Sequence, residues 1–214
     1  MQKDLYPIFL KIADKPVLVV GAGSIAYRKI NALLQCGADV TVVSPEAVED
    51  IKLLAEKGQI QWKQREFEDQ DVNDCFLIVA STSNREINVR ITELARANRI
   101  YINVVDVPDL CDFYVPSIVD RSPLKIAIST EGMAPAFARR IRKELEMQFP
   151  ESIGKYVMLL GSLRESVRKI MPDMVQKAGM ALASSKAMQL WNDGKHQEAE
   201  KLLKDETDRL IDNN

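Results

Sequence analysis

The chain has few of the residues that bind structural metals or form disulfide frameworks. It contains 3 cysteines and 1 histidine among 214 residues. The cysteines, Cys36, Cys75 and Cys111, are far apart, odd in number and not part of a C-x-x-C pair, which argues against a disulfide scaffold and against a Cys/His zinc site. We therefore expect no metal site and three free thiols, packed as small apolar core residues in a reducing compartment.

Long apolar runs and a strong net charge are also absent. No apolar run approaches the roughly 20 residues that span a bilayer. The N-terminal stretch MQKDLYPIFLKIADK has charges on both sides of a very short apolar run, unlike a signal peptide. The net charge of -2 argues against a general polyanion binder. We expect a cytoplasmic protein that needs neither a membrane nor a nucleic-acid partner.

Buried strand patterns alternate with helical patterns in the first half of the chain. The runs with strand character cover 16–20, 40–43, 60–67, 75–82 and 100–106, and those with helical spacing follow Gly23 and cover 47–57 and 86–98. Branched apolar runs are typical of strands buried on both faces. This alternation predicts an α/β fold of Rossmann type, with a largely parallel sheet and 60–67 at its edge.

The pattern changes near residue 113. Two extended runs over 113–130 predict a β hairpin, and helices are expected over 134–149, 151–170, 173–191 and 195–211. In the first of these helices, the spacing of Phe137, Ile141 and Leu145 predicts a buried stripe. We predict three domains: a nucleotide-binding domain over 1–112, a hairpin-and-helix region over 113–149 and a helical domain over 150–214.

The stretch GAGSIA places Gly21, Gly23 and Ala26 in G-x-G-x-x-A spacing. The stretch follows a strand and opens a helix, the context in which this spacing lets a pyrophosphate approach the backbone and the helix N-terminus. Ser24 and Ile25 would then contact the cofactor together with the two glycines. The alternative is a glycine turn without a ligand.

The acid that normally ends the second strand of a dinucleotide-binding fold, and binds the adenosine ribose there, is absent. Ser44 and Pro45 occupy that place, and Glu46 follows. No arginine stands nearby to bind a 2′-phosphate and Glu46 would repel one, so the sequence favours NAD over NADP. After the fourth strand, Thr82 and Ser83 either line the cofactor cleft or form a polar turn only.

Asp106 lies in the stretch NVVDVPDLCDF, at the end of the fifth predicted strand. Open α/β sheets bind ligands at the carboxyl ends of their strands. A carboxylate there can accept the proton that leaves a substrate when a hydride departs. The alternative is a turn-forming residue before Pro108.

Basic residues cluster in the predicted hairpin and the helix that follows it. Arg121 and Arg139 are among them, and such a group either binds a substrate rich in carboxylates or forms a solvated face. Ser129 belongs to the stretch STEG that leads into the helix. Hydroxyl and N–H groups of that stretch are candidates for contact with an anion.

Three stretches carry a resemblance to a known family: LYPIFLKIADKPVLVVGAGSIAYRKI, NVVDVPDLCDFYVPSIVDRSPLKIAIST and APAFARRIRKELE. The chain resembles the precorrin-2 dehydrogenases of siroheme biosynthesis, both the stand-alone enzymes and the N-terminal part of siroheme synthase. The resemblance is strongest from about residue 5 to residue 150. Because the chain ends after its helical region, without room for a methyltransferase domain, it looks like the stand-alone form.

The resemblance implies NAD-dependent oxidation of precorrin-2, a tetrapyrrole with many carboxylates, to sirohydrochlorin. It implies that Asp106 is the catalytic residue. Our candidates for contact with such a substrate are Asn103, Arg121, Ser129 and Arg139. The resemblance also implies a homodimer, with 113–149 as the dimerisation region. Two alternatives remain: a bifunctional enzyme that also inserts iron as a ferrochelatase, and a regulatory protein that senses a dinucleotide.

Overall fold

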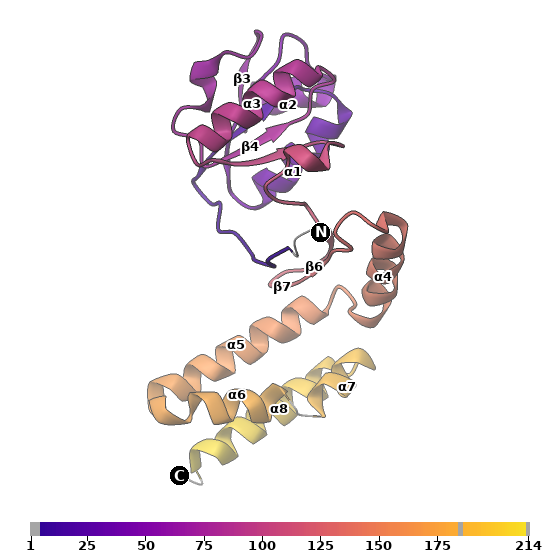
Figure 1. The fold of residues 1–214 in the computed structure, drawn as a ribbon. Helices are drawn as coiled ribbons and strands as arrows, with labels where there is room; N and C mark the ends of the chain where they lie inside the picture. The colour runs from indigo at the N-terminus through magenta and orange to yellow at the C-terminus, as the bar shows by residue number, and fades with distance from the viewer. Residues whose placement is uncertain (1–4, 184–185, 213–214) are drawn as a thin grey trace. The chain divides into compact units, whose positions relative to one another are not determined.

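The computed structural model describes residues 5–183 and 186–212, which form two compact units (Figure 1). The first, here called the sheet unit, is Met1–Val115, and the second, here called the helical unit, is Pro116–Asn214. The predicted division into three domains stays a prediction.

The sheet unit contains five parallel strands in the order β3-β2-β1-β4-β5. The strands are β1 (Pro16–Val20), β2 (Asp39–Val43), β3 (Gln61–Lys63), β4 (Leu77–Ala80) and β5 (Tyr101–Val104). The predicted α/β class with a largely parallel sheet is confirmed, and β3 lies at the edge as expected. Parallel pairing brings all five carboxyl ends to one edge of the sheet.

Helices cover both faces of this sheet. They are α1 (Ser24–Gln35), α2 (Glu49–Glu56) and α3 (Arg85–Ala97), with short 3₁₀ turns η1 (Asp69–Val72) and η2 (Pro108–Leu110). Val19 of β1 belongs to the same core cluster as Ile30 of α1. Leu18, one residue earlier, belongs to the opposite cluster with Ile91 of α3. Successive strand residues point to opposite faces, which explains the continuous apolar run in β1.

Three strands are shorter than the sequence predicts. The predicted runs 60–67, 75–82 and 100–106 contain only the shorter β3, β4 and β5. The ladder between β4 and β5 ends at the pair Ala80 and Val104. Beyond these residues the chain leaves the sheet and forms loops at the carboxyl edge, so apolar residues near the ends of the predicted runs pack outside the ladder.

The helical unit begins with the predicted hairpin. Its elements are β6 (Ser117–Arg121), β7 (Leu124–Ile128), α4 (Pro135–Gln148), α5 (Ile153–Ile170), η3 (Pro172–Met174), α6 (Val175–Ala183), α7 (Ala187–Asn192) and α8 (His196–Asp212). The two strands are antiparallel. The prediction of one helix over 173–191 was wrong, because η3, α6 and α7 are separate elements and Lys186 lies in a turn. Within that predicted helix, Ser184 and Ser185 lie outside the described residues.

A small apolar core holds α5, α6, α7 and α8 together. Figure 1 shows the ribbons of these four helices. It contains Tyr156, Leu182, Trp191 and Leu203. The Trp191 ring packs on Tyr156 with 5.3 Å between ring centroids, and its Nε1 donates to the Ser152 carbonyl oxygen at 3.1 Å. Burial of large aromatic rings supplies much of the stability of so small a core.

The predicted buried stripe on α4 was wrong in part. Phe137 is 54% exposed, and Ile141 and Leu145 are only half-buried. Met133, two residues before α4, and Met147, in its last turn, are 77% and 78% exposed. The described residues of this chain therefore leave much of the apolar face of α4 uncovered.

The cysteines also depart from the expectation of uniformly buried thiols. All three are free, but Cys36 is exposed, while Cys75 and Cys111 are half-buried. Among the described residues, no helix combines the length and the apolar character that crossing a bilayer requires.

Candidate cofactor and catalytic site

The glycine loop after β1 has the two properties that a pyrophosphate site requires. Gly21 has a φ of 96°, and a Cβ atom on it would stand 2.5 Å from the Ser81 carbonyl oxygen, so only glycine fits beside the end of β4. A Cβ atom on Gly23 would meet no atom within 4 Å. Packing within the chain therefore does not require glycine at position 23, and the backbone there is open to a ligand.

The loop leads directly into the N-terminus of α1. Gly23 is the N-cap of this helix and supplies no side-chain cap, and the first turn contains no acid. The amides of Ser24 and Ile25 belong to the first turn, where N–H groups lack intrahelical acceptors. The positive end of the helix and these amides fit an anionic group such as a pyrophosphate.

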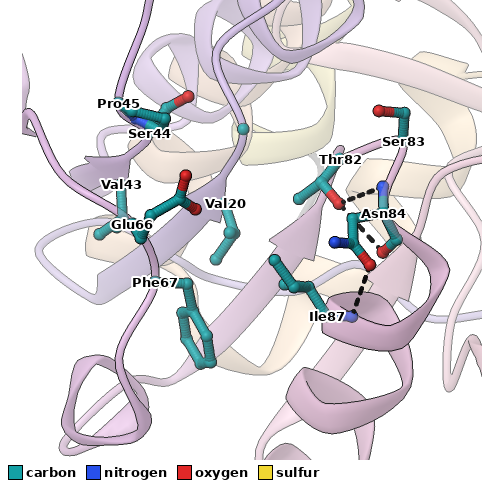
Figure 2. Close-up of a pocket in the computed structure, with 11 residues that line it drawn as sticks. Val20, Val43, Ser44, Pro45, Glu66, Phe67, Thr82, Ser83, Asn84 and Ile87 are labelled. Carbon is teal, nitrogen blue, oxygen red and sulfur yellow. Dashed lines mark hydrogen bonds between the residues drawn. The ribbon is translucent and has the colours of Figure 1, made fainter.

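A pocket of about 190 Å³ opens beside this loop at the carboxyl edge of the sheet (Figure 2). Its lining residues are Val20, Gly21, Val43, Ser44, Pro45, Glu66, Phe67, Thr82, Ser83, Asn84 and Ile87. Five predicted cofactor residues thus come together here: Gly21, Ser44, Pro45, Thr82 and Ser83. The other three, Gly23, Ser24 and Ile25, lie outside the lining, at the start of α1.

Sequence reasoning missed two lining residues that follow β3, Glu66 and Phe67. It relied instead on Glu46, which is not in the lining. These two residues could have been found from the position of β3 beside β2, because residues that follow either strand reach the same edge of the sheet. Taking 60–67 as one continuous strand hid this signal.

The loop after β4 shapes the pocket with its own hydrogen bonds. The Thr82 hydroxyl oxygen accepts from the Asn84 amide at 3.0 Å. Asn84 is the N-cap of α3, and its side-chain oxygen accepts from the amides of Glu86 and Ile87 at 3.0 and 3.2 Å. Thr82 therefore fixes the turn, and Ser83 between them is exposed.

Asp106 lies beyond the end of β5, at the same edge of the sheet. Its φ is 60°, in the left-handed region that Asp and Asn tolerate better than most residues, and its side chain is exposed. Two backbone hydrogen bonds anchor the loop on either side: Val105 N to Ala80 O at 2.9 Å, and Asp112 N to Ile102 O at 2.8 Å. The loop is therefore ordered around an open carboxylate.

Cys111 and Asn103 hold this loop from inside. The Cys111 Sγ accepts from the Val104 amide at 3.2 Å and lies 3.1 Å from the Val104 carbonyl oxygen, to which it donates. Burial raises the pKa of the Cys111 thiol, so the thiol keeps its proton. Asn103 is only 7% exposed, and its Nδ2 donates to the Phe113 carbonyl oxygen at 2.9 Å. The Asn103 amide thus makes a contact within the chain, and its substrate contact stays a prediction.

A lysine on α1 faces the Asp106 loop. Burial is the largest influence on the pKa of Lys29 and lowers it, as does Arg28, whereas the negative charge of Asp106 raises it. Within the described residues the Asp106 carboxylate has no ion pair or hydrogen bond. Lys29 thus provides a positive charge near Asp106 without occupying its oxygens.

The remaining predicted substrate residues belong to the helical unit. The Arg121 side chain is only 11% exposed, pairs with Glu151 at 3.1 Å and donates from Nε to the Phe149 carbonyl oxygen at 2.7 Å. Arg121 thus joins the hairpin to the segment after α4, and its substrate contact stays a prediction. The Ser129 hydroxyl accepts from the Glu131 amide at 3.1 Å.

Arg139 is the predicted substrate residue whose side chain makes no contact with a described residue that would occupy its guanidinium. Its side chain is exposed and forms no ion pair or hydrogen bond with any described residue. Arg142 on the same helix pairs with Glu146. No group of three or more His, Cys, Asp or Glu side chains in the described part of the chain could hold a metal ion.

Comparisons with known proteins agree with this geometry. A family model described as "Putative NAD(P)-binding" matches residues 8–117, and a second, "Sirohaem biosynthesis protein central", matches residues 121–148. The first match covers more than half of the chain, which therefore belongs to this NAD(P)-binding family. The second covers β7 and α4.

Curated relatives extend the resemblance to siroheme biosynthesis. The chain is 48% identical over 162 residues to siroheme synthase of Vesicomyosocius okutanii, a match that covers 76% of this chain and 35% of that protein. It is 44% identical over 170 residues to siroheme synthase of Methylococcus capsulatus, covering 79% and 36%. The chain thus spans about a third of the length of these relatives.

A solved structure is similar over nearly the whole chain. The structure of SirC, precorrin-2 dehydrogenase, is 26% identical with a TM-score of 0.74, and the match covers 92% of this chain and 100% of that one. The resemblance to precorrin-2 dehydrogenases that the sequence indicates is thereby confirmed. Together with the glycine loop and the pocket, these findings indicate a fold that binds a nicotinamide cofactor.

Proposed function

We propose that this protein oxidises precorrin-2 to sirohydrochlorin in siroheme biosynthesis, with NAD as its cofactor. The single observation that carries the proposal is the similarity to SirC, precorrin-2 dehydrogenase, over the full length of that chain. The glycine loop, the open N-terminus of α1 and the pocket support the cofactor.

The oxidation removes two hydrogens from the substrate, one as a hydride and one as a proton. A bound nicotinamide ring would supply the hydride acceptor. Asp106 accepts the proton from a carbon or N–H group of the substrate, or orients the substrate for that transfer. Because the carboxylate is exposed, it can then pass the proton to water.

The helical unit supplies candidate contacts for a substrate with many carboxylates. Arg139 has an uncommitted guanidinium, which forms charge-assisted hydrogen bonds with carboxylates. The exposed apolar side chains of Met133, Phe137 and Met147 support the homodimer, because an apolar face on α4 needs a covering surface. We place the reaction in the cytoplasm.

The proposal is tested with Asp106→Asn in the full chain. Asparagine preserves the shape of the side chain and tolerates the left-handed backbone, but it cannot accept the proton. We expect NADH formation from precorrin-2 and NAD to fall at least about 100-fold, while the Kd for NAD measured by titration calorimetry stays unchanged. Asp109→Asn, an exposed acid in η2, is the matched control and should retain activity.

Two results would contradict the proposal. A folded wild-type protein that binds NAD but forms no NADH from precorrin-2 would exclude the dehydrogenase activity. Full activity of Asp106→Asn would exclude Asp106 as the catalytic residue. Incubation of the wild-type protein with sirohydrochlorin and ferrous or cobalt ion, followed by visible spectroscopy, tests the alternative that the protein also inserts a metal.

A further inference from the structure

The pocket is lined by one carboxylate, although no acid directly follows the second strand in the sequence. In dinucleotide-binding folds an acid at the end of the second strand binds the adenosine ribose. Here Ser44 follows β2, and the acid in the pocket is Glu66, which comes from the loop after the neighbouring strand β3. Because β2 and β3 are parallel and paired up to Val43 and Lys63, their following loops lie side by side.

The Glu66 carboxylate is free to bind a ligand. Figure 2 shows it in the pocket between Ser44 and Val20. Among the described residues it has no ion pair and no hydrogen bond. The described lining contains no lysine and no arginine, so no cation there neutralises Glu66 or would receive a phosphate.

The loop that carries Glu66 is rigidly held. Arg65 Nη1 donates to the Glu66 carbonyl oxygen at 2.8 Å. The same guanidinium binds both oxygens of the buried Asp71, at 2.7 and 2.6 Å. Lys63 adds an ion pair to Asp71 at 3.1 Å. A bidentate pair with a buried carboxylate fixes the arginine, and the arginine fixes the backbone at Glu66.

A second contact ties the end of β3 to the end of β2. Trp62 Nε1 donates to the Ser44 carbonyl oxygen at 3.0 Å. The two sides of the pocket that Ser44 and Glu66 form are thus connected through β3. A binding group held in place in this way loses little freedom when a ligand arrives.

We propose that Glu66 selects NAD over NADP by accepting hydrogen bonds from the adenosine ribose hydroxyls and repelling a 2′-phosphate. This inference rests on the proposed NAD-dependent function. A carboxylate accepts hydrogen bonds but has none to donate, so it suits two hydroxyl donors. A phosphate at the same position would place like charges together without a cation to screen them.

The test compares Kd values for NAD and NADP, and for ADP-ribose and its 2′-phosphate, by titration calorimetry. Glu66→Gln removes the charge at nearly constant size. Glu46→Gln is the matched control, because Glu46 is the acid nearest to β2 along the sequence and lies outside the lining. Trp62 fluorescence in urea verifies that both variants fold.

For Glu66→Gln we expect NAD to bind about tenfold more weakly, which corresponds to the loss of one charge-assisted hydrogen bond. NADP should bind more tightly than to the wild type, so the preference for NAD falls by more than about tenfold. The ADP-ribose pair should change in parallel, which assigns the effect to the ribose. Glu46→Gln should leave every Kd within about twofold.

The outcomes separate this inference from the proposed function. An unchanged NAD/NADP preference in Glu66→Gln, or a change in Glu46→Gln instead, would overturn the role of Glu66. A wild type that binds neither dinucleotide would overturn both proposals. A wild type that binds NAD and shows the expected change in Glu66→Gln, but does not oxidise precorrin-2, would support Glu66 and exclude the proposed reaction.

Discussion

The sheet unit and the helical unit bury their apolar residues in different ways. The sheet unit has two core clusters, one on each face of a parallel sheet, and α1, α2 and α3 cover both faces. The helical unit has one smaller cluster and leaves Met133, Phe137 and Met147 of the α4 region exposed. Both faces of the parallel sheet are thus covered by helices of the same unit, although the segment before β1 leaves Tyr6 and Phe9 85% and 69% exposed. In the helical unit, the apolar face that stays exposed belongs to the α4 region.

Each unit contains one of the two tryptophans, which allows the units to be followed separately. Trp62 lies in β3 and Trp191 lies in α7. Trp191→Phe therefore leaves a reporter for the sheet unit alone, and Trp62→Phe leaves one for the helical unit. The predictions below use these two reporters and begin with the largest expected effect.

The first prediction concerns the smaller core. Trp191→Ala removes a side chain that is 7% exposed and packs between Tyr156 and His196. We expect the free energy of unfolding of the helical unit to fall by about 3–5 kcal/mol. Circular dichroism in urea should show early loss of helix while the Trp62 transition stays in place. A shift of both transitions by the same amount would show that the two units unfold as one.

The second prediction concerns the glycine loop of the sheet unit. Gly21→Ala places a Cβ atom against Ser81 at a positive φ, and we expect a loss of about 2–4 kcal/mol from strain and overpacking. Urea unfolding followed by Trp62 should move to lower concentration, and NAD affinity should drop. Gly23→Ala is the control with space for its Cβ, and it should preserve stability. Equal loss of stability in both variants would refute the close approach at Gly21.

The third prediction concerns Asp71, whose side chain is 1% exposed. Burial alone would raise the pKa of this carboxyl, but hydrogen bonds from Arg65, the Glu68 amide and Lys63 outweigh it and lower the pKa from 3.8 to about 2. A lowered pKa means that the stabilisation is complete above pH 3.8 and is lost as the pH falls through 2.

Asp71→Asn should therefore cost the sheet unit about 2 kcal/mol at pH 7, and the difference from wild type should shrink between pH 4 and pH 2. Urea unfolding followed by Trp62 at several pH values measures this difference. Glu68→Gln, an exposed neighbour, serves as the control. A difference that stays constant with pH would rule out the ionised Asp71 as its source.

The fourth prediction has the smallest effect on the stability of the single chain and concerns the uncovered face of α4. Phe137→Asp should leave the Trp191 transition within about 0.5 kcal/mol, while the affinity of the proposed homodimer falls at least about 30-fold by sedimentation equilibrium. Leu53→Asp alters a similarly exposed apolar residue of the sheet unit, and we expect no effect on assembly. An unchanged dimer in Phe137→Asp would remove α4 from the interface.

Most of the fold was predictable, because apolar periodicity along the chain records which face each element buries. The strands at β1 and β2, the helix after the glycine loop and the hairpin over β6 and β7 all follow from local pattern. The strand ends were not predictable. Whether Phe67 continues β3 or turns into the pocket depends on where pairing with β2 stops, and the sequence of β3 alone carries no such information.

The exposure of α4 shows a second limit of prediction from local sequence patterns. Helical spacing identifies Phe137, Ile141 and Leu145 as one apolar stripe, but spacing does not say which surface covers it. Within this chain that stripe is largely open. Arg121 shows a similar limit for charge, because the sequence identifies a basic residue but not its contacts with the Phe149 carbonyl oxygen and Glu151 between α4 and α5.

The sequence by itself determined the class of fold, the glycine loop and the acid after β5, because these depend on residue types at short, fixed spacing. Only the tertiary structure decided that Glu66 rather than Glu46 enters the pocket, and that Asn103 and Arg121 donate hydrogen bonds to backbone carbonyl groups of this chain. These outcomes depend on which strands and loops become neighbours. Such contacts join residues far apart in the chain, and their free energy depends on burial and pairing that no local pattern records.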